Sequence, residues 1–409
     1  MTRGAQGLGL SMAEFVTMMA MMMALTALSV DIMLVALPSM ASDFGLTDPN
    51  QQQFIVTVYL MSFAAGHLFA GPISDRFGRR PVILGGLVIY SIGAILAVVA
   101  ESFTVLLVAR VIQGLGAAGP RVVAVAVIRD NFSGRAMSQV MSFVMTVFIM
   151  VPIIAPALGS FITLVGSWHL IFVFLLAFAI VGFGWIYMRL RETNPELAEG
   201  ETRAGVRVAI RTMVGSRQTV GYVLSLGFVF GCLMNYVATS QQLFADIYGI
   251  VDWFPLVFAS GAGAMVVSSL VNARLVQRLG MRFLSHGALL LMVALAGLMS
   301  IVMAVMPIIP VFVFLPFIIL CFFLVGLILP NFNAIAMEPL GRVAGTGAAF
   351  VGFVMTGAGA ILGGTLGQLY DQTVHPMILG YFIYASIVLI IVTITEKGRI
   401  LQPSQGHSE

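Results

Sequence analysis

Charged residues are scarce in this chain of 409 residues, where Asp, Glu, Lys and Arg together make up 9%. Soluble globular domains usually carry about 25% charged residues, so the chain is not expected to fold as one in water. Cysteine is also rare, because only Cys232 and Cys321 are present and both lie within apolar runs. This argues against a disulfide framework or a thiolate metal site, and both are interpreted as packing residues.

Patterns typical of common enzymes and ATPases are missing as well. The sequence contains no Gly-x-x-x-x-Gly-Lys-Ser/Thr, no His-Glu-x-x-His and no Cys-x-x-Cys. One Gly-x-Gly-x-x-Gly match, at residues 114–119, has no strand before it and lies inside an apolar run, where small residues allow helices to pack closely. We therefore expect no enzyme, no cofactor and no metal site.

Apolar residues make up 60% of the chain and gather in twelve long stretches. A helix of about 20 apolar residues crosses a hydrocarbon core of roughly 30 Å and pairs its own backbone groups in lipid. The sequence therefore predicts an all-α integral membrane protein with twelve transmembrane helices. The first stretch is too long for the apolar core of a signal peptide and is expected to remain as a span. The stretches are residues 14–38, 54–73, 82–100, 103–128, 138–162, 169–188, 219–244, 254–273, 284–306, 308–336, 344–368 and 376–395.

The distribution of charge predicts the orientation of these spans. Lys and Arg outside the spans fall near the two termini and in every second loop. The remaining loops carry only acidic charges, namely Asp43, Asp48, Glu101, Asp246, Asp252 and Asp371. Short loops rich in Lys and Arg stay in the cytoplasm, so both termini are expected there. The basic residues that give the net charge of +3 are distributed according to this topology and form no single patch. No nucleic-acid partner is therefore expected.

A polar stretch between the sixth and seventh spans predicts two six-helix halves, residues 1–188 and 219–409, joined by a linker at 189–218. Within this linker, basic and apolar residues recur at helical spacing and would occupy separate faces of a helix. A short amphipathic helix on the inner membrane surface would explain this pattern. A basic linker that only fixes topology explains it equally well. The residues on the two faces are Arg203, Arg207 and Arg211 on one, and Val206, Ile210 and Met213 on the other.

A compact charged turn between the second and third spans is expected to act in conformational change. Gly78 permits a backbone angle that a side chain would oppose, and Asp75 is placed near the positive end of the next helix. The turn has a degenerate copy 202 residues later, where Gly280 falls on Gly78. Such parallel six-span repeats build one class of secondary transporter. The turn residues are Gly71, Asp75, Arg76, Gly78, Arg79 and Arg80, and their matches in the copy include Arg278 and Arg282.

Four stretches together match the signatures of one transporter family. The charged turn reads Gly71-x-x-x-Asp75-Arg76-x-Gly78-Arg79-Arg80, and the fourth span contains Arg110-x-x-Gln113-Gly114-x-Gly116. The first span ends in Asp31-x-x-x-x-x-Leu37-Pro38, and the fifth contains Pro152-x-x-x-Pro156-x-x-Gly159. In these residues the sequence resembles the major facilitator superfamily, specifically the twelve-span drug:proton antiporters, and most closely the bicyclomycin and chloramphenicol resistance (Bcr/CflA) group.

The resemblance implies a fold of two six-helix halves and export of small amphipathic compounds such as antibiotics. Inward proton flow and alternating access of the halves would drive this export. It also implies a monomer in the inner membrane of a bacterium, with a small-molecule substrate, protons and the lipid bilayer as its partners. Pro152, Pro156 and Gly159 are expected to permit a kink and tight packing in the fifth span.

Asp31 is the one acidic residue deep within a span, where a charge costs about 2.5–3.5 kcal/mol on insertion scales. It lies at a depth similar to that of Arg110, so the two side chains could face each other. The resemblance implies that Asp31 carries the proton and that Arg110 takes part in proton coupling. A static ion pair and a contact with substrate remain alternatives for Asp31. His67 is a second candidate proton site, because histidine titrates near neutral pH, but a histidine hydrogen-bonded within the bundle is the more common arrangement.

Other polar residues within spans are candidates for a substrate cavity. Arg121 lies about three helical turns from Arg110 and on the same helical face. Facing a cavity, Arg121 would favour substrates with an anionic or strongly hydrogen-bonding group. Pairing with a buried partner and snorkelling toward the cytoplasm are the alternatives. Asn235, Gln241 and Asn331 either bind substrate or hold helices together.

Two other functions are compatible with these residues. A proton-coupled transporter of a metabolite, such as an amino acid or organic acid, would also use Asp31 and Arg121. A membrane sensor or scaffold that transports nothing would tolerate replacement of Asp31, whereas both kinds of transporter require it.

Overall fold

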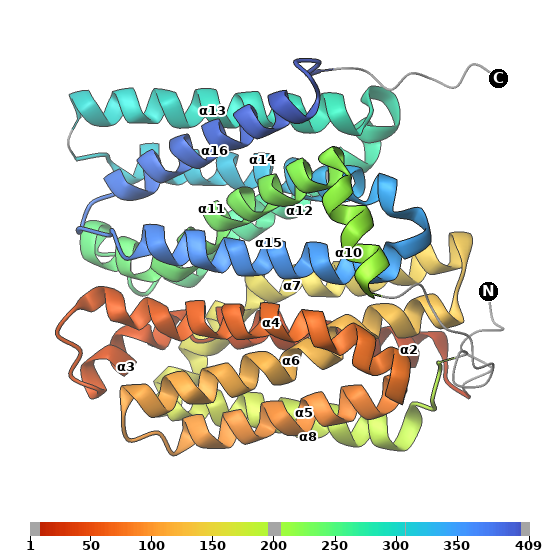
Figure 1. The fold of residues 1–409 in the computed structure, drawn as a ribbon. Helices are drawn as coiled ribbons and strands as arrows, with labels where there is room; N and C mark the ends of the chain where they lie inside the picture. Colours follow the sequence, from red (N-terminus) through yellow and green to blue (C-terminus); the bar gives the residue numbers. More distant parts are fainter. Residues whose placement is uncertain (1–8, 195–205, 307, 402–409) are drawn as a thin grey trace. The chain divides into compact units, whose positions relative to one another are not determined.

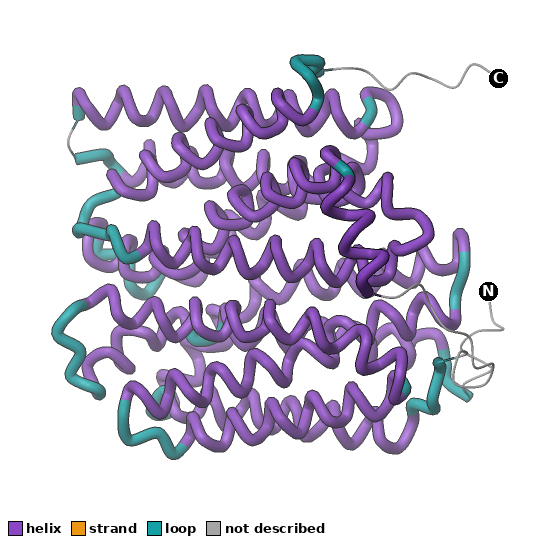
Figure 2. Tube along the Cα trace, in the orientation of Figure 1, coloured by secondary structure: helices purple, strands orange, loops and turns teal. Residues whose placement is uncertain are grey.

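The computed structural model describes residues 9–194, 206–306 and 308–401. These residues form helices and short connections, with no strand among them (Figures 1 and 2). Twelve helical segments within this part of the chain are long and apolar enough to cross a membrane, and they coincide with the twelve predicted stretches. The predicted all-helical, twelve-span architecture is confirmed.

The chain divides into two compact units, Met1–Arg203 and Ala204–Glu409, and each is described by itself. The helices of the first unit are α2 (Met12–Asp31), η1 (Leu34–Ala36), α3 (Leu37–Asp43), η2 (Pro49–Gln53), α4 (Phe54–Phe77), α5 (Arg79–Val98), α6 (Phe103–Asn131), α7 (Gly134–Val165) and α8 (His169–Arg189). Those of the second are α10 (Val206–Gly215), α11 (Arg217–Tyr248), α12 (Phe254–Leu279), α13 (Met281–Val305), α14 (Val311–Met337), η3 (Glu338–Val343), α15 (Ala344–Gly367) and α16 (His375–Thr395).

The first span is interrupted rather than continuous. α2 ends at Asp31, the tighter turn η1 follows, and α3 resumes with Pro38 in its first turn. A continuous helix would need an N–H at Pro38 to bond the carbonyl one turn earlier, and proline has none. Proline is well tolerated in the first turn of a helix, so the break falls just before it.

In the first unit α6 packs closely against both α4 and α5 because glycines line its two sides. A Cβ at Gly114 would overlap the Tyr59 carbonyl on α4, and one at Gly116 would overlap the Tyr90 backbone nitrogen on α5. Residues 114–119 therefore serve helix packing, as their place within an apolar run predicts.

The predicted helix in the polar stretch between the units forms as α10, whereas Arg203 lies outside the described residues. Met213 was expected on its membrane-facing side. The structure instead buries Met213 against Leu340, with Met337 and Phe350 alongside. This part of the apolar face therefore packs on protein of the second unit rather than on lipid.

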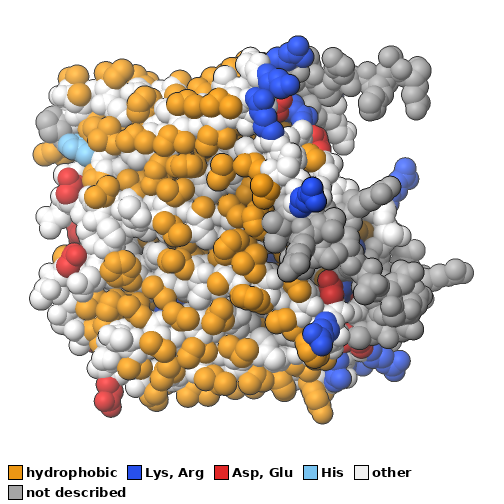
Figure 3. Space-filling view, in the orientation of Figure 1, with side chains coloured by type: hydrophobic (Ala, Val, Ile, Leu, Met, Phe, Trp, Pro, Cys, Tyr) orange, Lys and Arg blue, Asp and Glu red, His pale blue; other side chains and the backbone are white. Residues whose placement is uncertain are grey.

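Basic side chains gather at one end of the helices within each unit, as the blue side chains in Figure 3 indicate. In the first unit this basic end lies where α4 meets α5. Arg80, at this end, donates to the Tyr187 carbonyl near the end of α8. In the second unit, Arg282 at the start of α13 pairs with Glu338 and Glu396. We call these regions the basic ends of the two units.

Candidate functional site

Asp31 occupies the point at which the first span breaks. It is the last residue of α2, and only 5% of its surface is exposed. Its carboxylate makes no hydrogen bond or ion pair with any residue that the structure describes. A buried carboxylate without a partner is unusual, because burial of an uncompensated charge is costly.

The backbone beside Asp31 is held closely by α7. A Cβ on Gly159 would overlap the Ile32 carbonyl and would lie 2.9 Å from Cγ2 of Val35. Only glycine allows this approach, so the expected tight packing at Gly159 is present. Pro152 and Pro156 both lie inside α7, which is continuous from Gly134 to Val165. Each proline removes one hydrogen bond from that helix.

Arg110 is fully buried on α6 and bonded to neutral groups. Its Nη2 donates to the Ser29 carbonyl at 3.0 Å, its Nε to the Ile55 carbonyl at 3.1 Å and its Nη1 to Oε1 of Gln113 at 2.8 Å. Its guanidinium also lies 4.2 Å from the centre of the Tyr59 ring. These contacts tie α6 to α2 and α4 and use nitrogens on every branch of the guanidinium.

The structure does not bring Asp31 and Arg110 into a pair. Arg110 bonds α2 at Ser29, whose hydroxyl lies 2.6 Å from the Tyr90 hydroxyl of α5. Asp31 is two residues further on, about 200° around the helix, and therefore points away from that cluster. Similar depth in two spans does not by itself determine which face of its helix each residue occupies.

Arg121 lies nearer the basic end of α6 and makes no hydrogen bond with a described residue. Its guanidinium lies 4.5 Å from the centre of the Phe148 ring on α7, and its Nη1 is buried without a partner. The buried partner considered as an alternative is therefore an aromatic face rather than an acid. Nε2 of His67 on α4 is also buried without a partner.

The three amide candidates lie in the second unit and differ in how far they are satisfied. Asn331 donates to Oδ1 of Asn272 at 2.6 Å and to the Leu327 carbonyl, so it holds α14 to α12. Asn235 reaches the Gly363 carbonyl on α15 at 3.4 Å, but its Oδ1 is buried without a partner. Oε1 of Gln241 is likewise unpartnered. Asn331 therefore has a structural contact, and the other two retain a free acceptor.

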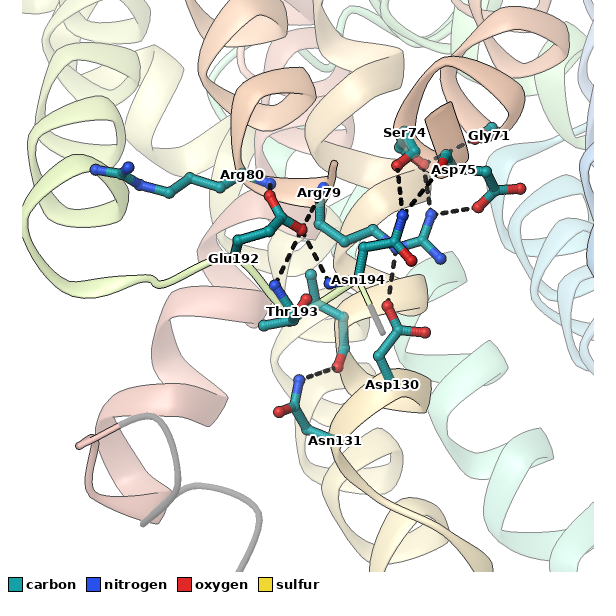
Figure 4. Close-up of polar contacts among 11 residues, drawn as sticks. Gly71, Ser74, Asp75, Arg79, Arg80, Asp130, Asn131, Glu192, Thr193 and Asn194 are labelled. Atoms are coloured by element: carbon teal, nitrogen blue, oxygen red, sulfur yellow. Dashed lines mark hydrogen bonds and ion pairs between the residues drawn. The ribbon is translucent and has the colours of Figure 1, made fainter. Parts of the chain in front are cut away.

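The charged turn forms a dense polar cluster at the basic end of the first unit (Figure 4). Nη1 of Arg79 lies 2.5 Å from Oδ1 of Asp75 and 2.8 Å from Oγ of Ser74, while its Nε lies 2.8 Å from Oδ2 of Asp130. Arg79 is only 1% exposed. The cluster therefore joins the ends of α4 and α6 to the start of α5.

Glu192, rather than Asp75, is the carboxylate at the positive end of α5. Its two oxygens accept from the backbone N–H groups of Arg79 at 2.8 Å and Arg80 at 3.1 Å (Figure 4). Asp75 lies in the last turn of α4 and pairs with the Arg79 side chain at the start of α5, so it lies close to that helix as expected, while the N–H groups of Arg79 and Arg80 are capped by Glu192. A carboxylate on the first free N–H groups of a helix is favoured by hydrogen bonding and by the helix dipole.

Glycine is required at the centre of this turn. Gly78 has φ 101° and ψ 160°, and Gly280 in the second unit has φ 82° and ψ 155°, a region that is essentially restricted to glycine. Each is the single residue between two helices, so the internal copy predicted at a 202-residue offset has the same backbone conformation. Gly71, by contrast, has open space around it, and Arg76 is exposed beside its neighbour Phe77.

Comparisons with known proteins agree with this twelve-span helical fold. A model of the Major Facilitator Superfamily matches residues 19–364. The chain belongs to the Major Facilitator Superfamily. It is 29% identical over 373 residues to a bicyclomycin resistance protein homolog of Haemophilus influenzae, a match that covers 89% of this chain and 91% of that protein.

Two further matches support the same assignment. The chain is 32% identical over 225 residues to the multidrug resistance protein MdtL of Shigella dysenteriae, covering 54% of this chain and 55% of that protein. The crystal structure of a D-xylose-proton symporter superposes with a TM-score of 0.74 at 16% identity, covering 94% of this chain and 97% of the other, and so shows the fold alone. The predicted family and fold are confirmed, and this superfamily member is a multi-pass membrane transporter rather than an enzyme.

Two residues of the superfamily member's charged cluster were not predicted. Asp130 was not considered, although it is the acid beside Arg129 at the end of α6, in a region otherwise rich in basic residues. Glu192 was not predicted to cap α5. An acid within a basic loop was the available signal for both residues, because a carboxylate there has a cation within reach.

Proposed function

We propose that this transporter exports small amphipathic compounds in exchange for protons, with Asp31 as the proton carrier. The observation that carries the proposal is a buried carboxylate without a partner at the interruption of the first span. An acid in a span is rare and is usually a functional group, and broken helices in transporters commonly mark the transport site. The names of the relatives, bicyclomycin resistance and multidrug resistance, support drug export.

The contacts around Asp31 suit a proton that is taken up and released. A buried carboxylate that lacks both a cation and a donor is costly to ionise, so it retains its proton until its surroundings change. Arg110 keeps its charge in neutral hydrogen bonds and leaves the carboxylate uncompensated. A conformational change that admits water or substrate to the break in α2 would release the proton.

We propose that the basic ends of both units face the cytoplasm and that the units alternate access to a central site. The gathering of Lys and Arg at these ends supports this orientation. The Arg79 cluster ties the ends of α4, α5 and α6 together, so the first unit would move as one body. One charge that moves through about 100 mV supplies about 2.3 kcal/mol, roughly a fifty-fold gradient per proton.

A metabolite with an acidic group is the second candidate substrate, because Arg121 and His67 each present a buried nitrogen without a partner. A sensor or scaffold is a third possibility, and it predicts that Asp31 can be replaced without effect.

The test is proton movement in everted membrane vesicles on addition of a panel of antibiotics and dyes. Asp31→Asn is the test variant, and Asp252→Asn, which changes an exposed acid in a loop, is the matched control. Proton release evoked by drugs in wild type and the control but not in Asp31→Asn is expected. Proton release that survives in Asp31→Asn would exclude that residue as the carrier.

A further inference from the structure

Arg121 and His67 lie on two helices that pack closely together, about three helical turns along α6 from Arg110. Arg121 follows Pro120 on α6, and His67 follows Gly66 on α4. A Cβ at Gly66 would meet Cβ of Ala118 at 2.5 Å, so α4 and α6 almost touch at this level. His67 directly follows Gly66, and Arg121 lies about one turn beyond Ala118, so this close approach places the two basic residues at a similar level of the paired helices.

Two phenylalanines border the pair. The Phe148 ring of α7 lies 4.5 Å from the Arg121 guanidinium, and the Phe63 ring meets the His67 ring edge-on at 4.4 Å between centroids. Each of the two basic residues therefore contacts one aromatic ring. Neither residue pairs with an acid in the part of the chain that the structure describes.

Arg110 and Arg121 both lie on α6 but differ in their hydrogen bonds. Arg110 has three neutral acceptors within 3.1 Å. Arg121 has none among the described residues, and the buried Nη1 of Arg121 and Nε2 of His67 both lack a hydrogen bond. A buried polar group left without a partner is destabilising, and more so when it is charged, so such groups need an explanation.

We infer that Arg121 and His67 form a subsite for the carboxylate of an aromatic or otherwise apolar substrate. This inference rests on the proposed function and narrows its substrate class. The guanidinium supplies the charge and a fork of N–H donors, and His67 donates through Nε2–H in its neutral form. The apolar body of the substrate packs against Phe148 and Phe63. The subsite is separate from Asp31, which would carry the proton.

The test measures binding of 2-naphthoate and of 2-naphthamide, its neutral counterpart, to the purified transporter in detergent. Wild type is expected to bind the carboxylate about tenfold more tightly than the amide, as a charge-assisted hydrogen bond implies. Arg121→Gln should bring the ratio close to one, and His67→Gln should lower it by about two- to fivefold. Arg274→Gln, which changes an exposed arginine on α12, should leave it unchanged.

Each outcome decides the inference. The inference is overturned if wild type shows no preference for the carboxylate. It is also overturned if Arg121→Gln and Arg274→Gln show the same preference. A lipid phosphate offers the same anionic chemistry, so phosphatidylglycerol is added in a separate arm. Displacement of 2-naphthoate by one equivalent of this lipid would identify a headgroup site and overturn the assignment to substrate.

A folding defect and a failure of antiport can both be separated from failure of the subsite. Arg121→Lys retains the charge, so it should keep part of the preference even if Arg121→Gln is poorly folded. Thermal stabilisation of wild type by 2-naphthoate but not by 2-naphthamide is an independent readout that needs no variant. Binding is measured without a proton gradient, so its result stands whether or not Asp31 carries the proton.

Discussion

The packing of Gly159 against the break beside Asp31 makes a sharp prediction. In Gly159→Ala the new methyl group would overlap the Ile32 carbonyl oxygen, lie 3.1 Å from the carbonyl carbon and lie 2.9 Å from Cγ2 of Val35. The first two are backbone atoms, so a side-chain rotation cannot relieve the overlap and α7 must move away from the first span. Overpacking of this kind costs about 1–3 kcal/mol.

Gly184→Ala on α8 is the matched control, because the nearest atom to its new methyl group is the terminal carbon of Met188 at 4.0 Å. Replacing glycine by alanine within a helix adds about 1 kcal/mol of stability where space allows. This gain applies to both variants, so Gly159→Ala should be less stable than Gly184→Ala by about the full overpacking cost.

Thermal unfolding in detergent measures the difference. At about 2–4 °C per kcal/mol for a unit of this size, the midpoint of Gly159→Ala should lie about 2–12 °C below that of the control. Drug-evoked proton movement should also fall in Gly159→Ala, because the displaced backbone carries Asp31. Equal midpoints and equal transport in the two variants would refute the close packing as described.

Three further variants test other parts of the first unit. Gly78→Ala should lower stability by about 1–3 kcal/mol because φ is 101°, whereas Gly71→Ala, in open space, should not; thermal midpoints compare them. Glu192→Ala should cost about 1–2 kcal/mol and increase hydrogen exchange at the start of α5, because the N–H groups of Arg79 and Arg80 lose their acceptor. Arg110→Gln should lower the thermal midpoint by leaving the acceptors of three hydrogen bonds without their donor, at about 1–3 kcal/mol for each buried group.

Much of the fold could be predicted because it depends on local pattern. Span number follows from apolar length, since a helix in lipid must be long enough and must pair its own backbone. The turn at Gly78 follows from a residue type, because only glycine readily adopts its conformation. α10 follows from helical periodicity over ten residues.

The candidate site was predicted less well because its contacts join distant segments. Glu192 reaches Arg79 across 113 residues of sequence, and Asp130 reaches it across 51. No local pattern specifies such pairings. Proximity in sequence correctly placed Asp75 near the start of α5, where it pairs with the Arg79 side chain, but it did not reveal that Glu192 accepts from the N–H groups there.

The face that a residue occupies was the other element missing from the sequence. Asp31 and Arg110 were placed at similar depth, but the break after Asp31 and its angular distance from Ser29 separate it from the arginine. Asn331 looked equivalent to Asn235, yet Asn272 on the neighbouring helix provides it with a partner. The position of a residue in the sequence indicates its depth within a span, whereas the face it occupies and the partner it contacts depend on tertiary packing.

Proton coupling through Asp31 is tested most directly in proteoliposomes of purified protein with a fluorescent pH indicator inside. An outward gradient of a transported drug should move protons in wild type and in Asp252→Asn, and should move none in Asp31→Asn, while all three still bind the drug. Proton movement in Asp31→Asn at the rate of wild type would show that another group carries the proton.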